Sequence, residues 1–137
     1  MGRKTYEGMA WYFPTADTGH PYAEIMNTAP KAVFSSTLKS AGWNNSTIVN
    51  GDTAAEIEKL KQHATGDIMV HGGVSFVQSL VRLDLVDGYL LTVFPYLAGP
   101  GATLFADLPR SQPPEFVSST AFGNGMLGLV YRRPQRP

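Results

Sequence analysis

The first residues of the chain combine side chains that bind a phosphate group. Arg3 and Lys4 supply two cations and Thr5 supplies a hydroxyl, directly after Gly2. The apolar spacing that follows predicts a helix beginning here, and the first amides of a helix have no partner within it and carry partial positive charge. Together these groups suit a bound phosphate. The alternative is the ordinary polar start of a solvated helix.

Two further segments have a similar potential. The first is a run of hydroxyls that follows an apolar segment, at Ser35, Ser36 and Thr37. The second is the pair Gly72-Gly73, ahead of a helical pattern, which would expose to an anion the amides of Gly73, Val74 and Ser75. Each also has a plain structural explanation, as a polar turn or as tight packing of a helix on a sheet. The glycine pair matches neither the dinucleotide fingerprint nor the Walker A pattern.

The composition excludes most other kinds of site. The chain has no cysteine, so it has no thiolate nucleophile, disulfide or zinc–thiolate centre. We expect no metal site, because no helical metal-ligand spacing joins the three histidines, His20, His63 and His71. Residues 73–77 match a serine-hydrolase elbow only in their first half. The sequence therefore assigns no catalytic residue.

Charge and hydropathy limit the partners. Eleven Lys and Arg balance eleven Asp and Glu, and this formal net charge of zero disfavours nucleic acid or an anionic membrane as a partner. The longest apolar run, Tyr89 to Ala98, is too short to span a membrane and contains Pro95. Because no signal peptide precedes the first helix, we expect a cytoplasmic protein.

The first part of the chain predicts two helices and two strands. The first helix ends at Pro14 and has one apolar face, formed by Tyr6, Met9, Ala10 and Phe13. Pro21 favours the start of a short second helix, whose inward residues would be Tyr22, Ile25 and Met26. The β-rich runs at residues 31–36 and 47–50 are predicted strands, separated by a polar loop that carries Trp43.

The rest of the chain predicts helices that alternate with strands. Thr53 and Glu56 form a capping box that begins a helix ending at Gly66. A buried strand at residues 67–71 leads into the glycine pair and a helix over 74–83. The apolar run 89–97 predicts a strand covered on both faces. Runs 116–122 and 126–133 flank Gly123-Asn124-Gly125, which indicates a β-hairpin.

This order of elements predicts one α/β domain over residues 1–137. The connections suit parallel pairing, so we expect three layers, α/β/α, around a mostly parallel sheet with a C-terminal antiparallel hairpin. In such sheets a ligand binds outside the carboxyl ends of the strands, which is where the three phosphate-binding candidates fall.

Four segments, taken in order, resemble the dihydrofolate reductase superfamily: Gly2–Glu7, Lys31–Ser36, Ile68–Gly73 and Leu85–Pro95. The closer resemblance is to the reductase domain of bacterial riboflavin biosynthesis, with Leu97–Gly101 and Leu104-Phe105 at the corresponding places. The resemblance covers nearly the whole chain. It implies a dihydrofolate reductase-like fold and NADPH as cofactor.

The resemblance also implies roles for individual residues. Arg3, Lys4 and Thr5 match the segment that holds the 2′-phosphate and pyrophosphate of NADPH, and the hydroxyls beside the 2′-phosphate match Ser35 and Ser36, with Thr37 next to them. The loop over the pyrophosphate and nicotinamide ribose matches Gly72, Gly73, Val74, Ser75 and Phe76. A cis peptide is implied between Gly72 and Gly73, and Thr92 matches a strand threonine on the substrate side.

One departure from the family bears on activity. The family has a strand, a loop, a helix and a further strand ahead of the Gly-Arg motif, whereas Met1 stands directly before it here. The resemblance thus implies an N-terminally truncated chain, which is a fragment of a longer protein or lacks part of the active site. A sheet lacking those strands would favour a homodimer or larger homo-oligomer.

Two functions remain open at this stage. The first is an NADPH-dependent reductase of a small heterocyclic substrate, resembling the reductases of dihydrofolate or of 5-amino-6-(5-phosphoribosylamino)uracil, with the N-terminal part present or supplied by another chain. The second is a non-catalytic NADP(H)-binding or interaction module.

Overall fold

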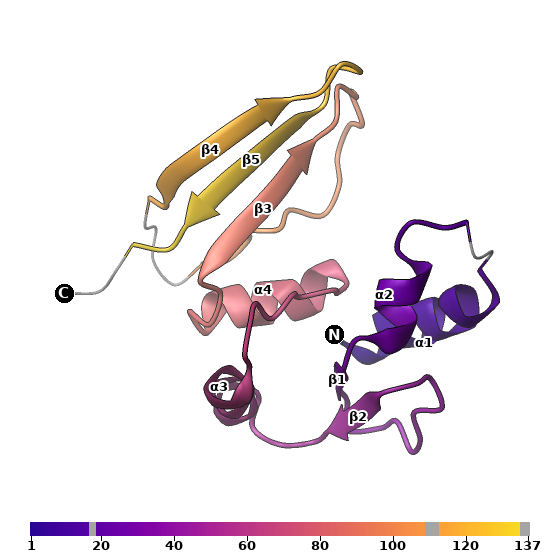
Figure 1. The fold of residues 1–137 in the computed structure, drawn as a ribbon. Helices are drawn as coiled ribbons and strands as arrows, with labels where there is room; N and C mark the ends of the chain where they lie inside the picture. Colours follow the sequence, from indigo (N-terminus) through magenta and orange to yellow (C-terminus); the bar gives the residue numbers. More distant parts are fainter. Residues whose placement is uncertain (17–18, 109–112, 135–137) are drawn as a thin grey trace. The chain divides into compact units, whose positions relative to one another are not determined.

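The computed structural model describes residues 1–16, 19–108 and 113–134 of the chain. It divides into two compact units, Met1–Val77 and Gln78–Pro137, and we describe each by itself (Figure 1). Within the described residues, no helix combines the length and apolar character that crossing a membrane requires. The prediction of one domain stays a prediction.

The first unit contains three helices, a short 3-10 turn and two strands. In chain order these are α1 (Arg3–Tyr12), η1 (Phe13–Thr15), α2 (Ala23–Thr28), β1 (Lys31–Phe34), β2 (Ser46–Val49) and α3 (Thr53–His63). The unit ends in the first turn of α4 (Val74–Arg82). Strands β1 and β2 form a parallel pair, with Val33 opposite Ile48.

The hydrophobic core of this unit is centred on Trp43. Tyr6, Met26 and Val33 are buried around it, and the Phe13 ring stacks on the indole at 6.0 Å between centroids. The polar groups of Tyr6 and Trp43 have hydrogen-bond partners. The Tyr6 hydroxyl accepts from Trp43 N at 3.0 Å, and Trp43 Nε1 donates to Asn27 Oδ1 at 2.7 Å. A buried polar group without a partner would cost free energy.

The predicted faces of the first two helices have different outcomes. The apolar face of α1 is confirmed, since Tyr6 is buried and Met9, Ala10 and Phe13 pack against the core. The inward face predicted for α2 is wrong at two positions, because the side chains of Tyr22 and Ile25 are 64% and 59% exposed. The six residues of α2 make fewer than two turns, so Ala23 and Met26 alone fill its buried side.

The beginning of α3 also differs from the prediction. Asp52 is the N-cap, and its carboxylate accepts from Ala55 N at 2.9 Å, so the capping box beginning at Thr53 is wrong by one residue. Asp and Thr cap helices by the same hydrogen bond, and the two lie side by side in the sequence. The helix ends at His63 rather than continuing to Gly66.

Residues 67–71, predicted as a strand, form no ladder in the structure. An apolar run becomes a strand only when another strand offers hydrogen-bonding partners, and the described residues supply none to this segment. The side chain of Met69 is 70% exposed. The prediction of a buried strand here is wrong.

The second unit is built on an antiparallel sheet. Its strands, β3 (Gly88–Val93), β4 (Glu115–Ala121) and β5 (Leu127–Arg132), lie in the order β3-β5-β4 (Figure 1). The hairpin of β4 and β5 confirms the prediction from Asn124-Gly125, and Gly125 has the positive φ of 83° that favours glycine. The prediction that the 89–97 strand is covered on both faces is wrong, since Leu90 is 73% exposed.

The α/β class with parallel and antiparallel pairing is therefore confirmed. The balance differs from the expectation, because two described strands pair in parallel and three pair antiparallel. Arg133 fixes the start of the second sheet by donating to Asp87 Oδ1 at 2.6 Å and to the carbonyl oxygen of Asp84.

Candidate functional site

The N-terminus of α1 is attached to the end of β1. Gly2 forms a parallel bridge with Phe34, and Phe34 N donates to the Met1 carbonyl at 2.9 Å. Helix α1 begins one residue later, at Arg3. The first turn of α1 and the loop after β1 are thus neighbours, although about 30 residues separate them in the sequence.

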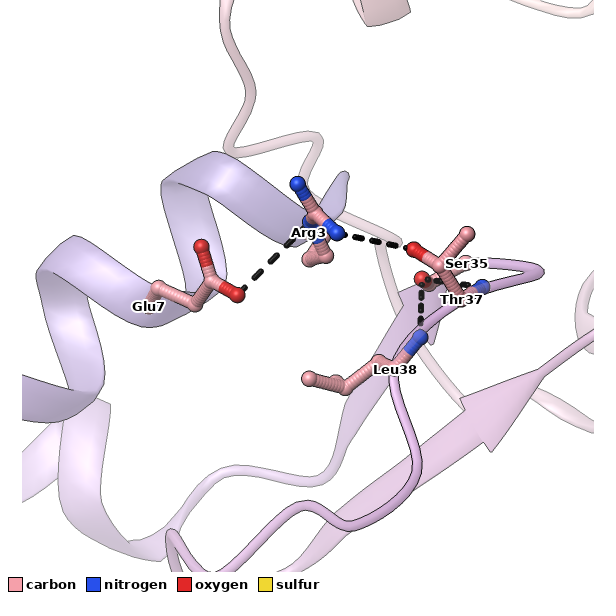
Figure 2. A network of polar contacts seen from close by, with 5 residues as sticks. All are labelled: Arg3, Glu7, Ser35, Thr37 and Leu38. Atoms are coloured by element: carbon pink, nitrogen blue, oxygen red, sulfur yellow. Dashed lines mark hydrogen bonds and ion pairs between the residues drawn. The ribbon is translucent and has the colours of Figure 1, made fainter.

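Arg3 joins these two segments through its side chain. Its Nη1 donates to Thr37 Oγ1 at 2.9 Å, and its Nε is 3.6 Å from Glu7 Oε1 on the next turn of α1 (Figure 2). Arg3 and Thr37 are both exposed. The guanidinium is therefore held at the surface, between a hydroxyl and a carboxylate, where a ligand could reach its remaining N–H groups.

The loop after β1 is shaped by Ser35. Its Oγ accepts from the backbone N of Thr37 at 3.2 Å and of Leu38 at 2.9 Å (Figure 2). A serine in this arrangement holds a turn, and its hydroxyl proton is still free to be donated. Ser36 and Thr37 are exposed at the tip of the turn.

The glycine pair lies against the same first turn of α1. Gly73 N donates to Thr5 Oγ1 at 2.8 Å, across 68 residues of sequence. Helix α4 begins directly afterwards at Val74, and Gly73 O accepts from Phe76 N at 3.1 Å. All peptide bonds among the described residues are trans, so the cis link expected between Gly72 and Gly73 is wrong.

The Phe76 side chain packs beside Phe34 and Gly2. Its ring lies 5.4 Å from that of Phe34, and a Cβ built on Gly2 would meet Phe76 Cβ at 3.4 Å. Aromatic packing of this kind fixes the close approach of the two helix starts. Val74 and Ser75 are exposed in the first turn of α4, where the leading amides of a helix have no intrahelical partner.

We call this group of residues the candidate anion site: Arg3, Lys4, Thr5, Ser35, Ser36, Thr37, Gly72, Gly73, Val74 and Ser75. All lie in the first unit, and direct hydrogen bonds link Arg3 to Thr37 and Thr5 to Gly73. Cationic, hydroxyl and amide donors converge there, which fits a nucleotide phosphate. Their role as ligands stays a prediction. Thr92 lies in the second unit, on β3 opposite Gly128, and stays a prediction for the substrate side.

Two features of the site were missed from the sequence. Glu7 is the ion-pair partner of Arg3, and its spacing of four residues on a predicted helix was a signal for it. The acceptor role of Thr5 toward Gly73 has no local signal, because it depends on the approach of two distant segments. No group of three or more His, Asp or Glu able to hold a metal ion occurs among the described residues.

Comparison with known proteins adds to this geometry. The family model of the RibD C-terminal domain matches residues 1–128. The chain belongs to the RibD C-terminal domain family. The resemblance found in the sequence is thereby confirmed, and the fold is that of the RibD C-terminal-like reductases.

Two curated proteins are similar to most of this chain. The uncharacterized protein YyaP of Bacillus subtilis is 29% identical over 133 residues, which is 95% of this chain and 70% of YyaP. The uncharacterized protein YwjB of the same organism is 26% identical over 126 residues, 92% of this chain and 68% of YwjB.

Two solved structures are similar. A protein of Shewanella sp. PV-4, assigned provisionally to riboflavin biosynthesis, has a TM-score of 0.77 and 25% identity, over 98% of this chain and 72% of its own. A pyrimidine reductase-like protein of Corynebacterium diphtheriae has a TM-score of 0.55 and 15% identity, over 77% of this chain and 50% of its own. At 15% identity, the similarity to the Corynebacterium diphtheriae protein is a similarity of fold alone.

Proposed function

We propose that this protein is an NADPH-dependent reductase of a small heterocyclic substrate. When bound, the cofactor supplies a hydride to a C=N or C=O carbon, and the protein binds and orients it. Membership of the RibD C-terminal domain family supports the reductase class. A substrate of the 5-amino-6-(5-phosphoribosylamino)uracil or dihydrofolate type is the finer part of the proposal.

The observation that carries the proposal is the placement of Arg3. Its guanidinium lies beside the turn that follows β1 and bonds to Thr37, so a cation and a hydroxyl of the turn lie together. A 2′-phosphate there would receive charge-assisted hydrogen bonds, each worth about 1.5–3 kcal/mol. Lys4 adds a second cation, and the first amides of α1 and α4 suit the pyrophosphate.

Binding of NADPH and NADH distinguishes this role for Arg3. We expect Arg3→Ala to weaken NADPH by roughly ten- to a hundredfold, because about 1.4 kcal/mol is a factor of ten. NADH has no 2′-phosphate, so its weaker binding should hardly change. Titration calorimetry of the native protein and the variant against both cofactors makes the comparison. Lys59→Ala, which removes an exposed cation from α3, is the matched control.

The outcomes separate the alternatives. Equal losses for NADPH and NADH would mean that Arg3 supports the fold or the pyrophosphate instead. A native chain that binds neither cofactor would contradict the proposal. Turnover is measured separately, by the oxidation of NADPH with a pterin or an aminouracil. Binding without turnover would favour a non-catalytic NADP(H)-binding module.

A further inference from the structure

Glu7 lies beside the cation on which the proposed function depends. Its Oε1 is 3.6 Å from Arg3 Nε, while Thr37 Oγ1 accepts from Arg3 Nη1 at 2.9 Å (Figure 2). Arg3 thus has two different neighbours, one neutral and one anionic. A phosphate that approaches Arg3 meets both.

The pair of Arg3 and Glu7 contributes little to the fold by itself. The two side chains are 43% and 52% exposed, and they are four residues apart on one helix. Exposed pairs of this type stabilise a helix only slightly, because water and salt screen the attraction. The carboxylate therefore has more influence on a charged ligand at Arg3 than on the stability of α1.

Thr37 and Glu7 act on such a ligand in opposite directions. The Thr37 hydroxyl accepts from Arg3 and can donate its own proton to a phosphate oxygen, which strengthens binding. The Glu7 carboxylate accepts only, so it competes with the phosphate for Arg3 and repels its negative charge. Among the described residues, the ion pair of Arg3 is with Glu7.

We propose that Glu7 is a specificity-determining residue, whose carboxylate weakens the binding of a nucleotide phosphate at Arg3. This inference rests on the proposed function, because it requires a phosphate at the candidate anion site. It goes beyond that function by assigning a charge that opposes the cofactor. Glu7 thereby narrows the preference for a 2′-phosphorylated nucleotide over its unphosphorylated counterpart.

The test uses two probes that differ in the 2′-phosphate, adenosine 2′,5′-bisphosphate and AMP. We expect Glu7→Gln to bind the bisphosphate about three- to tenfold more tightly than the native protein at low salt, by loss of one screened repulsion. AMP binding should differ by less than about twofold between Glu7→Gln and the native protein. The gain should shrink as salt is raised, and calorimetry at several salt concentrations measures it.

Three variants serve as controls. Glu7→Asp keeps the charge and should bind the bisphosphate as the native protein does, whereas Glu7→Ala, a second neutral variant, should reproduce the gain. Glu24→Gln removes an exposed carboxylate from α2 in the same unit and should leave the bisphosphate-to-AMP ratio unchanged. Circular dichroism of each variant verifies the helix content.

The possible results differ in what they overturn. Equal or weaker bisphosphate binding by both neutral variants, in a native protein that binds it, overturns the inference and leaves the proposed function in place. Weaker binding that Glu7→Asp restores would make Glu7 an orienting partner of Arg3, which also overturns it. A native protein that binds neither probe overturns both the inference and the proposed function.

Discussion

The backbone N–H of Gly73 donates to Thr5 Oγ1 at 2.8 Å, and this bond connects the starts of α1 and α4. A ligand that takes the Gly73 amide must therefore replace Thr5 as its acceptor. The threonine hydroxyl is then released to bond elsewhere in the candidate anion site. Thr5 thus holds the glycine loop in position when no anion is present.

Substitution of Thr5 tests this connection. Thr5→Val keeps the shape but removes the acceptor, so we expect the Gly73 amide to exchange with solvent roughly tenfold faster, which corresponds to the loss of about 1.4 kcal/mol of protection. NADPH binding should weaken as well. Hydrogen exchange followed by NMR measures the amide, and Thr5→Ser, which keeps the hydroxyl, is the control. Unchanged exchange in Thr5→Val would show that the bond does not order the loop.

Alanine substitutions at Gly72 and Gly73 should have different effects, one on stability and the other on cofactor binding. A Cβ on Gly73 would lie 3.8 Å from Thr5 Oγ1, an ordinary contact, so we expect Gly73→Ala to fold normally and to lose NADPH binding. A Cβ on Gly72 would lie 3.2 Å from the Phe76 ring and 3.4 Å from Val77 Cγ2. Gly72→Ala should therefore lower the free energy of unfolding by about 1–3 kcal/mol.

Urea unfolding and cofactor titration of both variants make the measurement. Normal NADPH binding by Gly73→Ala would remove the glycine loop from the candidate anion site. The structure leaves room within the chain for a Cβ at Gly73, so any loss of binding must come from the approach of the cofactor.

Lys31 should make the stability of the first unit depend on pH in the alkaline range. Its Nζ donates to Ala29 O at 2.7 Å and to Asn44 O at 2.8 Å, and it lies 4.4 Å from the centre of the Trp43 ring. Burial lowers the pKa of Lys31 below its usual 10.5. Between that lowered pKa and 10.5 the unfolded chain binds more protons, so the free energy of unfolding should rise with pH.

Lys31→Met isolates this contribution. Methionine keeps an unbranched apolar chain against Trp43 but has no titrating group, so the alkaline rise should be absent from the variant and should appear as the difference between the two proteins. The variant should also be less stable near neutral pH, by about 1–3 kcal/mol, because two carbonyls lose their donor. Urea unfolding over the alkaline range measures both effects. A rise that persists in Lys31→Met would assign it to another group.

Self-association is expected through the antiparallel sheet. All seven residues of β4 are exposed, and β3 and β4 each have one unpaired edge among the described strands. Exposed edges and apolar side chains such as Leu90 favour pairing with a second copy. Light scattering at concentrations on the order of micromolar should detect a dimer or larger assembly, at affinities common for protein interfaces.

Introducing a lysine on the antiparallel sheet, compared with the same change elsewhere, tests whether the sheet is the interface. Leu90→Lys should shift the equilibrium toward monomer, whereas Gln62→Lys, the same charge change at an exposed position of α3, should leave it unaltered. A well-folded native monomer at these concentrations would contradict the expectation.

Local patterns predicted some elements well. The face of α1 followed from a period of 3.6 residues and from Pro14, and the β4–β5 hairpin followed from Asn124-Gly125, because these signals act within a few residues. The segment 67–71 could not be predicted in this way. Its composition suits a strand, but a strand also needs a partner that the segment's own sequence does not specify.

The candidate anion site shows the same limit. The rule that ligands bind at the carboxyl ends of strands pointed to three segments, and the side chains of Arg3, Thr5 and Thr37 form the hydrogen bonds that link them. The identity of each bond was not predictable. Arg3 bonds to Thr37, because the turn held by Ser35 determines which hydroxyl faces the guanidinium.

The positions of the two tryptophans make the chain its own optical probe. Trp43 is 5% exposed and stacked on Phe13, whereas Trp11 is 79% exposed, and residues 78–137 contain no tryptophan. A soluble quencher therefore removes the emission of Trp11 first and leaves that of a single indole in the core of the first unit. The remaining fluorescence follows the unfolding of that unit alone, so a difference from the loss of β-sheet circular dichroism would reveal whether the two units unfold together.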